Sequence, residues 1–251
     1  MPILIGMFFS WSGCRGLQEE RLTIAVSANM QYAMEELIDR FESQTGISCE
    51  LIIGSSGKLT AQILEGAPFH LFFSADMKYP MEIYSEGLAE GPPQIYAHGY
   101  VIFWSLDEEI EFTSEGLLDQ DVRHIAIANP ETAPYGRAAY DVLTGMGVYD
   151  EIMPKLVFGE SVSQTNQFIL SGSSEVGLTA RSVVSSPAAE GKGHWQEADP
   201  GLYQPIEQGF VHLKRRNRVQ ENWAIEFERF LGSQAAIDIL HKFGYGMDRV
   251  R

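Results

Sequence analysis

The sequence is poor in basic residues, in cysteine and in long apolar runs. Its 251 residues hold 18 Lys+Arg against 34 Asp+Glu, a formal charge of −16. Nucleic acid and anionic membrane surfaces require a basic face on their partner, so both are disfavoured. Cys14 and Cys49 are too few for a disulfide scaffold, and the six histidines show no metal-ligand spacing. We therefore expect no metal site, no cofactor and no nucleic-acid partner.

Signatures of common enzyme classes are also missing. Gly54–Leu59 is similar to a phosphate-binding P-loop, but Ile52 stands where the motif needs its first glycine, and Leu59 stands where it needs Ser or Thr. The sequence has no Gly-x-Ser-x-Gly elbow and no Gly-x-Gly-x-x-Gly run. A Ser-His-Asp triad stays open, because its members need not be adjacent in sequence.

The first fourteen residues are unlike the rest of the chain. Residues 1–13 are apolar apart from two serines and are too short to span a bilayer. Trp11–Cys14 resembles the lipobox of bacterial lipoproteins, in which small residues precede a cysteine that is lipidated after cleavage. The chain departs from that motif in having Trp11 in place of leucine and no basic residue before the apolar run. We expect residues 1–20 to be an export signal or a lipoprotein-like N-terminus, with Cys14 as the lipidated residue.

From Leu22 onward, short β-branched runs alternate with segments of helical periodicity. This alternation predicts an α/β protein with mixed, mainly parallel sheets, which bind ligands at the carboxyl edge of the strands. The expected strands are 22–26, 48–53, 71–73, 100–104, 123–128, 156–158, 176–179 and 209–213; the expected helices are 30–45, 58–65, 135–144, 164–170 and two C-terminal helices whose apolar faces span 219–230 and 237–243.

Four of these helices begin with residues that donate hydrogen bonds. Asn29 precedes the first, Ser55–Gly57 the second, Pro134–Gly136 the third and Val162–Ser163 the fourth. Asn and Ser are ordinary N-caps when taken singly. Their recurrence after successive strands predicts that free N–H groups and positive dipole ends converge on one anion site without Lys or Arg.

Seven segments, which include these loops, share a pattern with one family: Ala25–Met30, Gly54–Leu59, Glu65–Phe69, Phe73–Asp76, Ala128–Gly136, Gly159–Gln164 and Lys242–Tyr245. In this order, from about Leu22 to Tyr245, the chain resembles the molybdate-binding proteins of bacterial ABC importers. The resemblance implies a two-lobed type II periplasmic binding-protein fold that closes on a tetrahedral oxyanion about a hinge. It implies residues 21–99 and 207–251 as lobe 1 and 100–206 as lobe 2.

Carried over by position, the resemblance implies a site made of neutral donors. Asn29 would give its side-chain amide and backbone N–H, and Ser56 its hydroxyl and backbone N–H. Tyr135 and Val162 would each give a backbone N–H from the second lobe. The outer contributors are expected to be Ser27, Ala28, Ser55 and Gly57.

Five further residues near the expected site need an interpretation. Some family members add a tyrosine hydroxyl near the strand at 177–180, where this chain has Ala180; Thr179 and Arg181 are further outer candidates. Asp76 is expected to cap or pack at the lobe junction, because an unpaired carboxylate would repel an anion. Arg137 is expected on a solvated face.

The resemblance implies a monomeric, non-enzymatic binding protein that captures molybdate, and also tungstate, for a membrane permease. It would work in the periplasm or, if lipid-anchored, on the outer face of the cytoplasmic membrane. Two alternatives stay open: another tetrahedral oxyanion (sulfate, thiosulfate or phosphate), and a soluble α/β hydrolase with Ser56 as nucleophile. Monoprotonated phosphate would favour a carboxylate in the site, and a hydrolase would need a histidine and an aspartate converging on Ser56.

Overall fold

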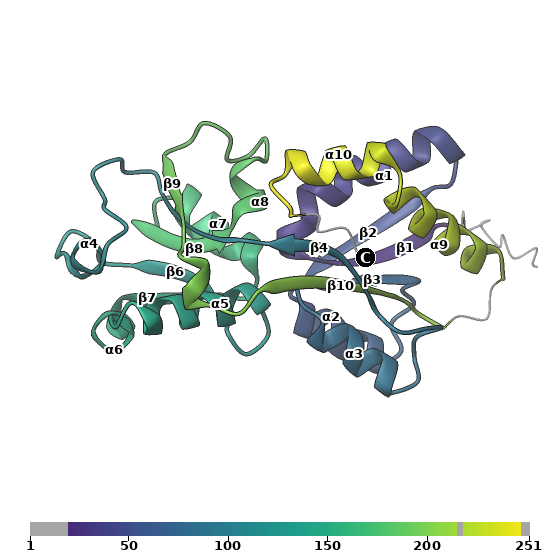
Figure 1. Cartoon of the computed structure of the whole chain (residues 1–251), viewed down its shortest axis with the longest axis horizontal. Helices are drawn as coiled ribbons and strands as arrows, with labels where there is room; N and C mark the ends of the chain where they lie inside the picture. Colours follow the sequence, from purple (N-terminus) through teal and green to yellow (C-terminus); the bar gives the residue numbers. More distant parts are fainter. Residues whose placement is uncertain (1–19, 215–217, 247–251) are drawn as a thin grey trace, which may run out of the picture.

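Two five-stranded sheets form two lobes that lie side by side along the long axis of the molecule (Figure 1). The structure is a computed structural model that describes residues 20–214 and 218–246. The expected export signal, with Cys14, lies outside these residues. None of the helices in the described ranges is both long and apolar enough to cross a membrane.

The first sheet is buried on both faces. Alternate residues of β1 (Leu22–Ser27), an interior strand, point to opposite sides. Leu22, Ile24 and Val26 pack under α1 (Gln31–Thr45), α9 (Arg218–Leu231) and α10 (Gln234–Lys242), and Ala25 packs under α2 (Ser56–Leu64) and α3 (Lys78–Ser85). The strand order is β2 (Cys49–Gly54), β1, β3 (Leu71–Phe73), β10 (Ile206–His212) and β4 (Gln94–Gly99).

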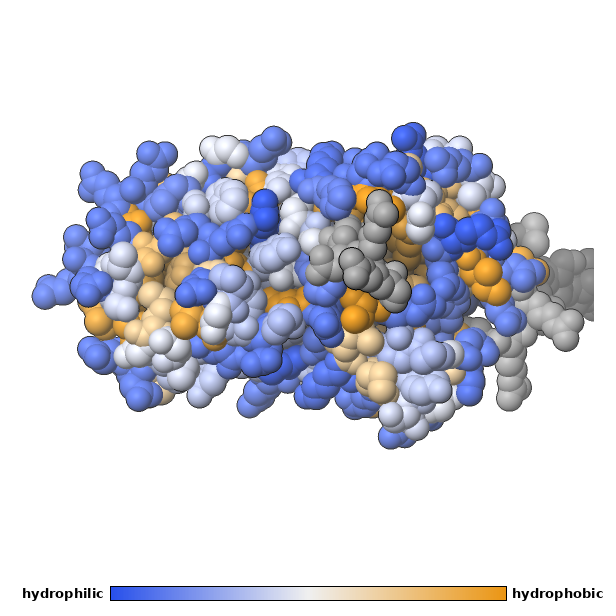
Figure 2. Space-filling model, in the orientation of Figure 1, coloured by the Kyte–Doolittle hydropathy of each residue, from blue (hydrophilic) through white to orange (hydrophobic). Residues whose placement is uncertain are grey.

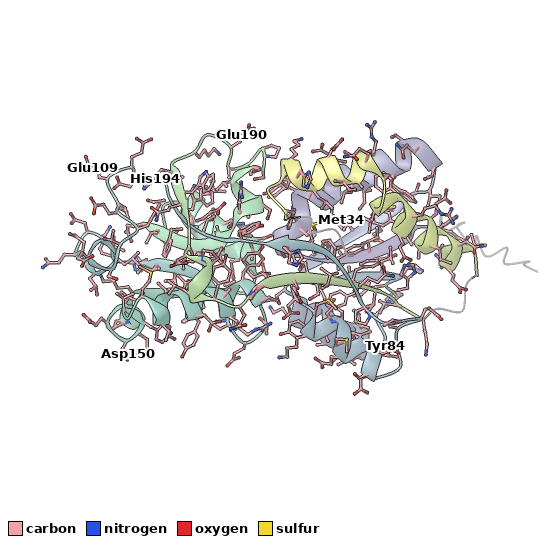
Figure 3. All side chains as sticks on the ribbon, in the orientation of Figure 1. Met34, Tyr84, Glu109, Asp150, Glu190 and His194 are labelled. Atoms are coloured by element: carbon pink, nitrogen blue, oxygen red, sulfur yellow. The ribbon has the colours of Figure 1, made fainter. Side chains whose placement is uncertain are left out.

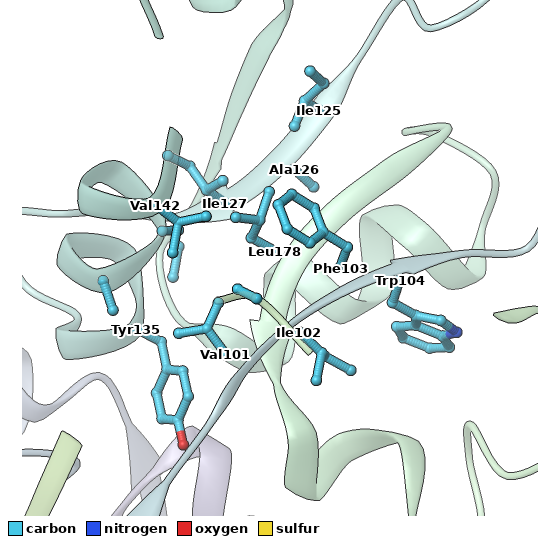
Figure 4. Packing of buried hydrophobic residues seen from close by; sticks show 14 of the residues in the cluster. Val101, Ile102, Phe103, Trp104, Ile125, Ala126, Ile127, Tyr135, Val142 and Leu178 are labelled. Carbon is cyan, nitrogen blue, oxygen red and sulfur yellow. The ribbon is translucent and has the colours of Figure 1, made fainter. Parts of the chain in front are cut away.

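The second sheet repeats this pattern. Its core holds Val101 and Phe103 together with Ile127, Val142 and Leu178 (Figure 4). The strand order is β7 (Leu156–Gly159), β6 (Ile125–Ala128), β8 (Val176–Ala180), β5 (Val101–Ser105) and β9 (His194–Glu197); the helices are α4 (Ser114–Leu118), α5 (Pro134–Gly145), α6 (Tyr149–Ile152), α7 (Val162–Leu170) and α8 (Arg181–Val184). Short 3₁₀ turns lie at Ala28–Met30, Met153–Lys155 and Pro200–Leu202.

The structure confirms the predicted two-lobed α/β fold. Each sheet holds two parallel and two antiparallel pairings, so the antiparallel share is larger than the sequence suggests. The sequence analysis missed β4, α3, α4, α6, α8 and β9. Strand β9 has no apolar pattern to detect, because it is an edge strand whose side chains are mostly exposed.

The chain passes between the lobes where β4 leads into β5 and where residues 203–205 lead into β10 (Figure 1). The first crossing requires glycine at Gly99, since a Cβ there would lie 2.1 Å from the Tyr135 hydroxyl. After the second crossing, α9 packs on the first lobe, where Phe227 and Phe230 place their ring centroids 4.9 and 5.6 Å from that of Phe41.

The surface agrees with the acidic composition. The face seen in Figure 2 is largely hydrophilic. Glu109 and Asp150 project from the far end of the second lobe, and Glu190 projects from its edge nearer the first lobe (Figure 3).

Candidate functional site

Strand register brings the four donor-rich helix starts to the carboxyl edges of the two sheets. In the first lobe, β1 and β2 pair in parallel up to Ser27 and Gly54, and helical structure begins directly after each strand. In the second lobe, β6 and β7 pair in parallel up to Ala128 and Gly159, and α5 and α7 follow. Both edges therefore present helix N-termini to the space between the lobes.

These helix starts surround a small cavity of about 10 Å³ between the lobes. None of the described residues that line it carries a charge. All four predicted binding residues line it, as do three of the four predicted outer contributors. The lining consists of Ser27, Ala28, Asn29, Ser55, Ser56 and Ala75 from the first lobe and Ala133, Pro134, Tyr135 and Val162 from the second.

Backbone N–H groups are the main donors at this cavity. Those of Asn29, Ser56, Tyr135 and Val162 belong to the first turn of their helices and have no hydrogen-bond partner in the described part of the chain. First-turn N–H groups lack an intrahelical acceptor and sit at the positive end of the helix dipole. They can therefore bind the oxygens of an anion.

Two hydroxyls supplement these amides. Ser56 Oγ accepts the Ala75 N–H at 3.0 Å, which leaves its own proton free to be donated. Ser55 Oγ is buried and has no partner among residues 20–214 and 218–246. A buried hydroxyl without a hydrogen-bond partner lowers stability, so we expect Ser55 to donate directly to a ligand and not only to contribute from the outside, as the sequence predicted.

The Asn29 side chain is used differently from the prediction. Its amide Nδ2 donates to Gln208 Oε1 at 2.9 Å and to Tyr245 Oη at 3.1 Å, and its Oδ1 accepts from Ser27 Oγ at 2.7 Å. The amide protons are therefore bound inside the protein. In this structure the donor that Asn29 has available is its backbone N–H.

Gln208, which the sequence analysis missed, connects the two lobes beneath the cavity. It is fully buried; its Oε1 also accepts from Tyr96 Oη at 2.9 Å, and its Nε2 donates to Tyr135 Oη at 3.4 Å. Tyr135 extends from α5 away from the aliphatic core of its lobe (Figure 4). Burial raises the pKa of Tyr135 and Tyr96 well above the usual phenol value, so both hydroxyls stay neutral.

Three predicted outer residues do not line the cavity. The Gly57 N–H donates to Thr132 O across the lobes at 2.9 Å, so the prediction that Gly57 contributes to the site is corrected. Thr179 Oγ1 donates to Asn166 within the second lobe. Arg181 pairs with Glu197 at 2.7 Å.

The expectation for Asp76 is confirmed, and that for Arg137 is wrong. Asp76 accepts the Tyr79 N–H at the start of α3 and forms an ion pair with Arg137 across the lobes. Arg137 is not on a solvated face, because the opposite lobe covers it and leaves its side chain 33% exposed.

The cavity has no group suited to proton transfer. No histidine or carboxylate is among the described residues that line it, so no base faces Ser56. Within the described ranges, no three His, Cys, Asp or Glu side chains gather as a metal site requires. Chemically, this arrangement can bind an anion through neutral donors.

Comparison with known proteins gives consistent matches. The profile of a family described as bacterial extracellular solute-binding protein matches residues 22–246. The molybdate-binding protein ModA of Rhodobacter capsulatus is 37% identical, over 88% of this chain and 86% of that protein. The solved structure of the Azotobacter vinelandii periplasmic molybdate-binding protein superposes with a TM-score of 0.86 at 32% identity, covering 91% of this chain and 100% of that one. The Escherichia coli ModA is 26% identical, over 74% of this chain and 73% of that protein.

Proposed function

Because the chain belongs to the bacterial extracellular solute-binding proteins, we propose that it captures molybdate between its lobes and delivers it to the permease of an ABC importer. The observation that carries this proposal is the uncharged cavity at which four helix starts meet. We propose that it acts as a binding protein and not as an enzyme, in line with the binding proteins to which it is similar.

The donor set suits a tetrahedral dianion. Four backbone N–H groups and the hydroxyls of Ser55 and Ser56 are available for four oxygens, each of which accepts about two hydrogen bonds. Each lobe holds only part of the set, so the ligand is fully bound only when the lobes meet. Helix dipoles supply the positive potential in place of cationic side chains.

Cavity size and chemistry decide between ligands. A volume of about 10 Å³ is far below the roughly 300–1,000 Å³ of pockets for larger organic ligands. Fixed backbone donors contact a large oxyanion fully and leave gaps around the smaller sulfate. Monoprotonated phosphate would favour an acceptor carboxylate, and none is among the described residues that line the cavity. We propose molybdate and tungstate as ligands for these reasons.

The proposal also covers the cellular setting. A protein that serves an importer works outside the cytoplasmic membrane, in the periplasm or held to the membrane through a lipid on Cys14. The monomer is the expected form, since one chain provides both walls of the cavity.

Calorimetric titration of the purified protein with molybdate, tungstate, sulfate and phosphate at one salt concentration tests the proposal. We expect tight binding of molybdate and tungstate and weak or no binding of sulfate and phosphate. Tighter binding of sulfate, or no heat with any of the four ions from folded protein, would contradict it.

A further inference from the structure

Two ion pairs join the lobes beside the cavity. Lys58 Nζ lies 2.7 Å from Glu160 Oε2, and Arg137 pairs with Asp76. In each pair, one residue belongs to the first lobe and the other to the second. All four residues stand within two positions of a residue that lines the cavity.

The two pairs differ in their surroundings. The Lys58 and Glu160 side chains are 46% and 70% exposed, and a pair in that setting contributes little. The Arg137 and Asp76 side chains are only 33% and 19% exposed. Arg137 Nη1 also donates to Pro130 O at 3.4 Å.

The Arg137–Asp76 pair has a third partner, Tyr79, on the Asp76 side of the junction. The guanidinium carbon of Arg137 lies 5.5 Å from the Tyr79 ring centroid, and its Nη1 lies 3.4 Å from the hydroxyl. The Tyr79 hydroxyl in turn donates to Glu131 O in the second lobe at 3.3 Å. Several contacts thus hold one guanidinium, which reduces the entropy lost in forming the pair.

We propose that Arg137 and Asp76 form a clasp that slows the release of the oxyanion, an inference that rests on the proposed function. Its partners lie on opposite lobes, so the ion pair exists only while the lobes are together and must break before they separate. Arg137 also neutralises a carboxylate next to Ala75, a residue that lines the cavity. Both are positioning residues, because neither lines the cavity itself.

If the pair acts as a clasp, removing Arg137 and removing Asp76 should speed the release of the oxyanion by unequal amounts. A contact that only stabilises the fold does not predict this difference. Arg137→Gln leaves the Asp76 carboxylate unpaired beside a bound dianion, whereas Asp76→Asn leaves a cation there. We expect molybdate to dissociate about tenfold faster from Arg137→Gln and only about threefold faster from Asp76→Asn. The double variant, which has no charge at either position, should release molybdate more slowly than Arg137→Gln.

Stopped-flow dissociation of molybdate from the full chain measures these rates, with thermal unfolding of the ligand-free variants alongside. Lys58→Gln is the matched control, because it also removes one positive charge from an ion pair between the lobes. We expect it to stay within about twofold of the wild type, while Arg137→Lys retains most of the slow release. Unfolding temperatures without ligand should stay near that of the wild type.

Equal dissociation rates for Arg137→Gln and Lys58→Gln would overturn the clasp. So would a double variant that releases molybdate as fast as Arg137→Gln, or a loss of stability without ligand that parallels the faster release. Failure of the proposed function is distinguishable, because the wild type would then bind no molybdate in the first titration.

Discussion

Replacing Gly57 with alanine is expected to weaken ligand binding without weakening the fold. Gly57 lies in the first turn of α2, and its N–H donates to Thr132 O in the opposite lobe. A Cβ at this position would lie 3.0 Å from Thr132 O, 3.1 Å from Thr132 Cα and 2.7 Å from the Tyr79 hydroxyl. The Tyr79 side chain can move aside, but the Thr132 backbone can retreat only if the lobes move apart.

The size of the effect follows from these contacts. Overfilling a packed contact costs about 1–3 kcal/mol, and here the cost falls on the state in which the lobes meet. That range corresponds to roughly 5-fold to 150-fold weaker binding. In the ligand-free protein, alanine in place of glycine in a helix stabilises the fold by about 0.4–1 kcal/mol, because it restricts the unfolded chain.

Calorimetric titration with molybdate and thermal unfolding without ligand measure the two effects separately. Gly91→Ala is the control, because no atom lies within 4 Å of the Cβ it would add. If Gly57→Ala binds molybdate as tightly as Gly91→Ala, the close approach of α2 to the Thr132 backbone does not govern binding, and the reasoning fails.

Three further predictions concern the cavity itself. Ser56→Ala removes the hydroxyl that donates to the ligand and leaves the Ala75 N–H without its acceptor. We therefore expect at least about tenfold weaker molybdate binding, measured by calorimetry. Asn29→Ala should lower the stability of the ligand-free protein by about 1–3 kcal/mol in urea unfolding, because Gln208 loses a buried partner; unchanged stability would contradict the network. Molybdate affinity should stay constant from about pH 6 to 9, since the described residues that line the cavity include no carboxylate or histidine and burial raises the pKa of Tyr135 well above its usual value. A titration step within that range would refute this.

The sequence was sufficient for the elements that depend on local pattern. The apolar spacing at Met34, Leu37, Ile38 and Phe41 predicted α1, and all four residues are buried. The run at Leu71–Phe73 was predicted with the bounds that β3 has in the structure. Such patterns are readable because periodicity and helix starts involve residues only a few positions apart.

The sequence analysis likewise found the segments at which α2, α5 and α7 begin, together with the interpretation that they meet at one cavity. It placed the first residues of these helices one or two positions late, at 58, 135 and 164 in place of Ser56, Pro134 and Val162. That interpretation succeeded because parallel strands align their carboxyl ends, and register then carries each following helix to the same edge. That an anion binds at this cavity stays a prediction, which rests on the free N–H groups of these helix starts.

Only the tertiary structure decided what the side chains around the cavity do. The Asn29 amide bonds Gln208 and Tyr245, which lie 179 and 216 positions away, and Arg137 pairs with Asp76 at a separation of 61. Local sequence determines where a helix begins, because that choice depends on neighbouring residues. Which distant side chain satisfies a buried amide or guanidinium depends on how the two lobes pack, and no pattern within a short segment contains that information.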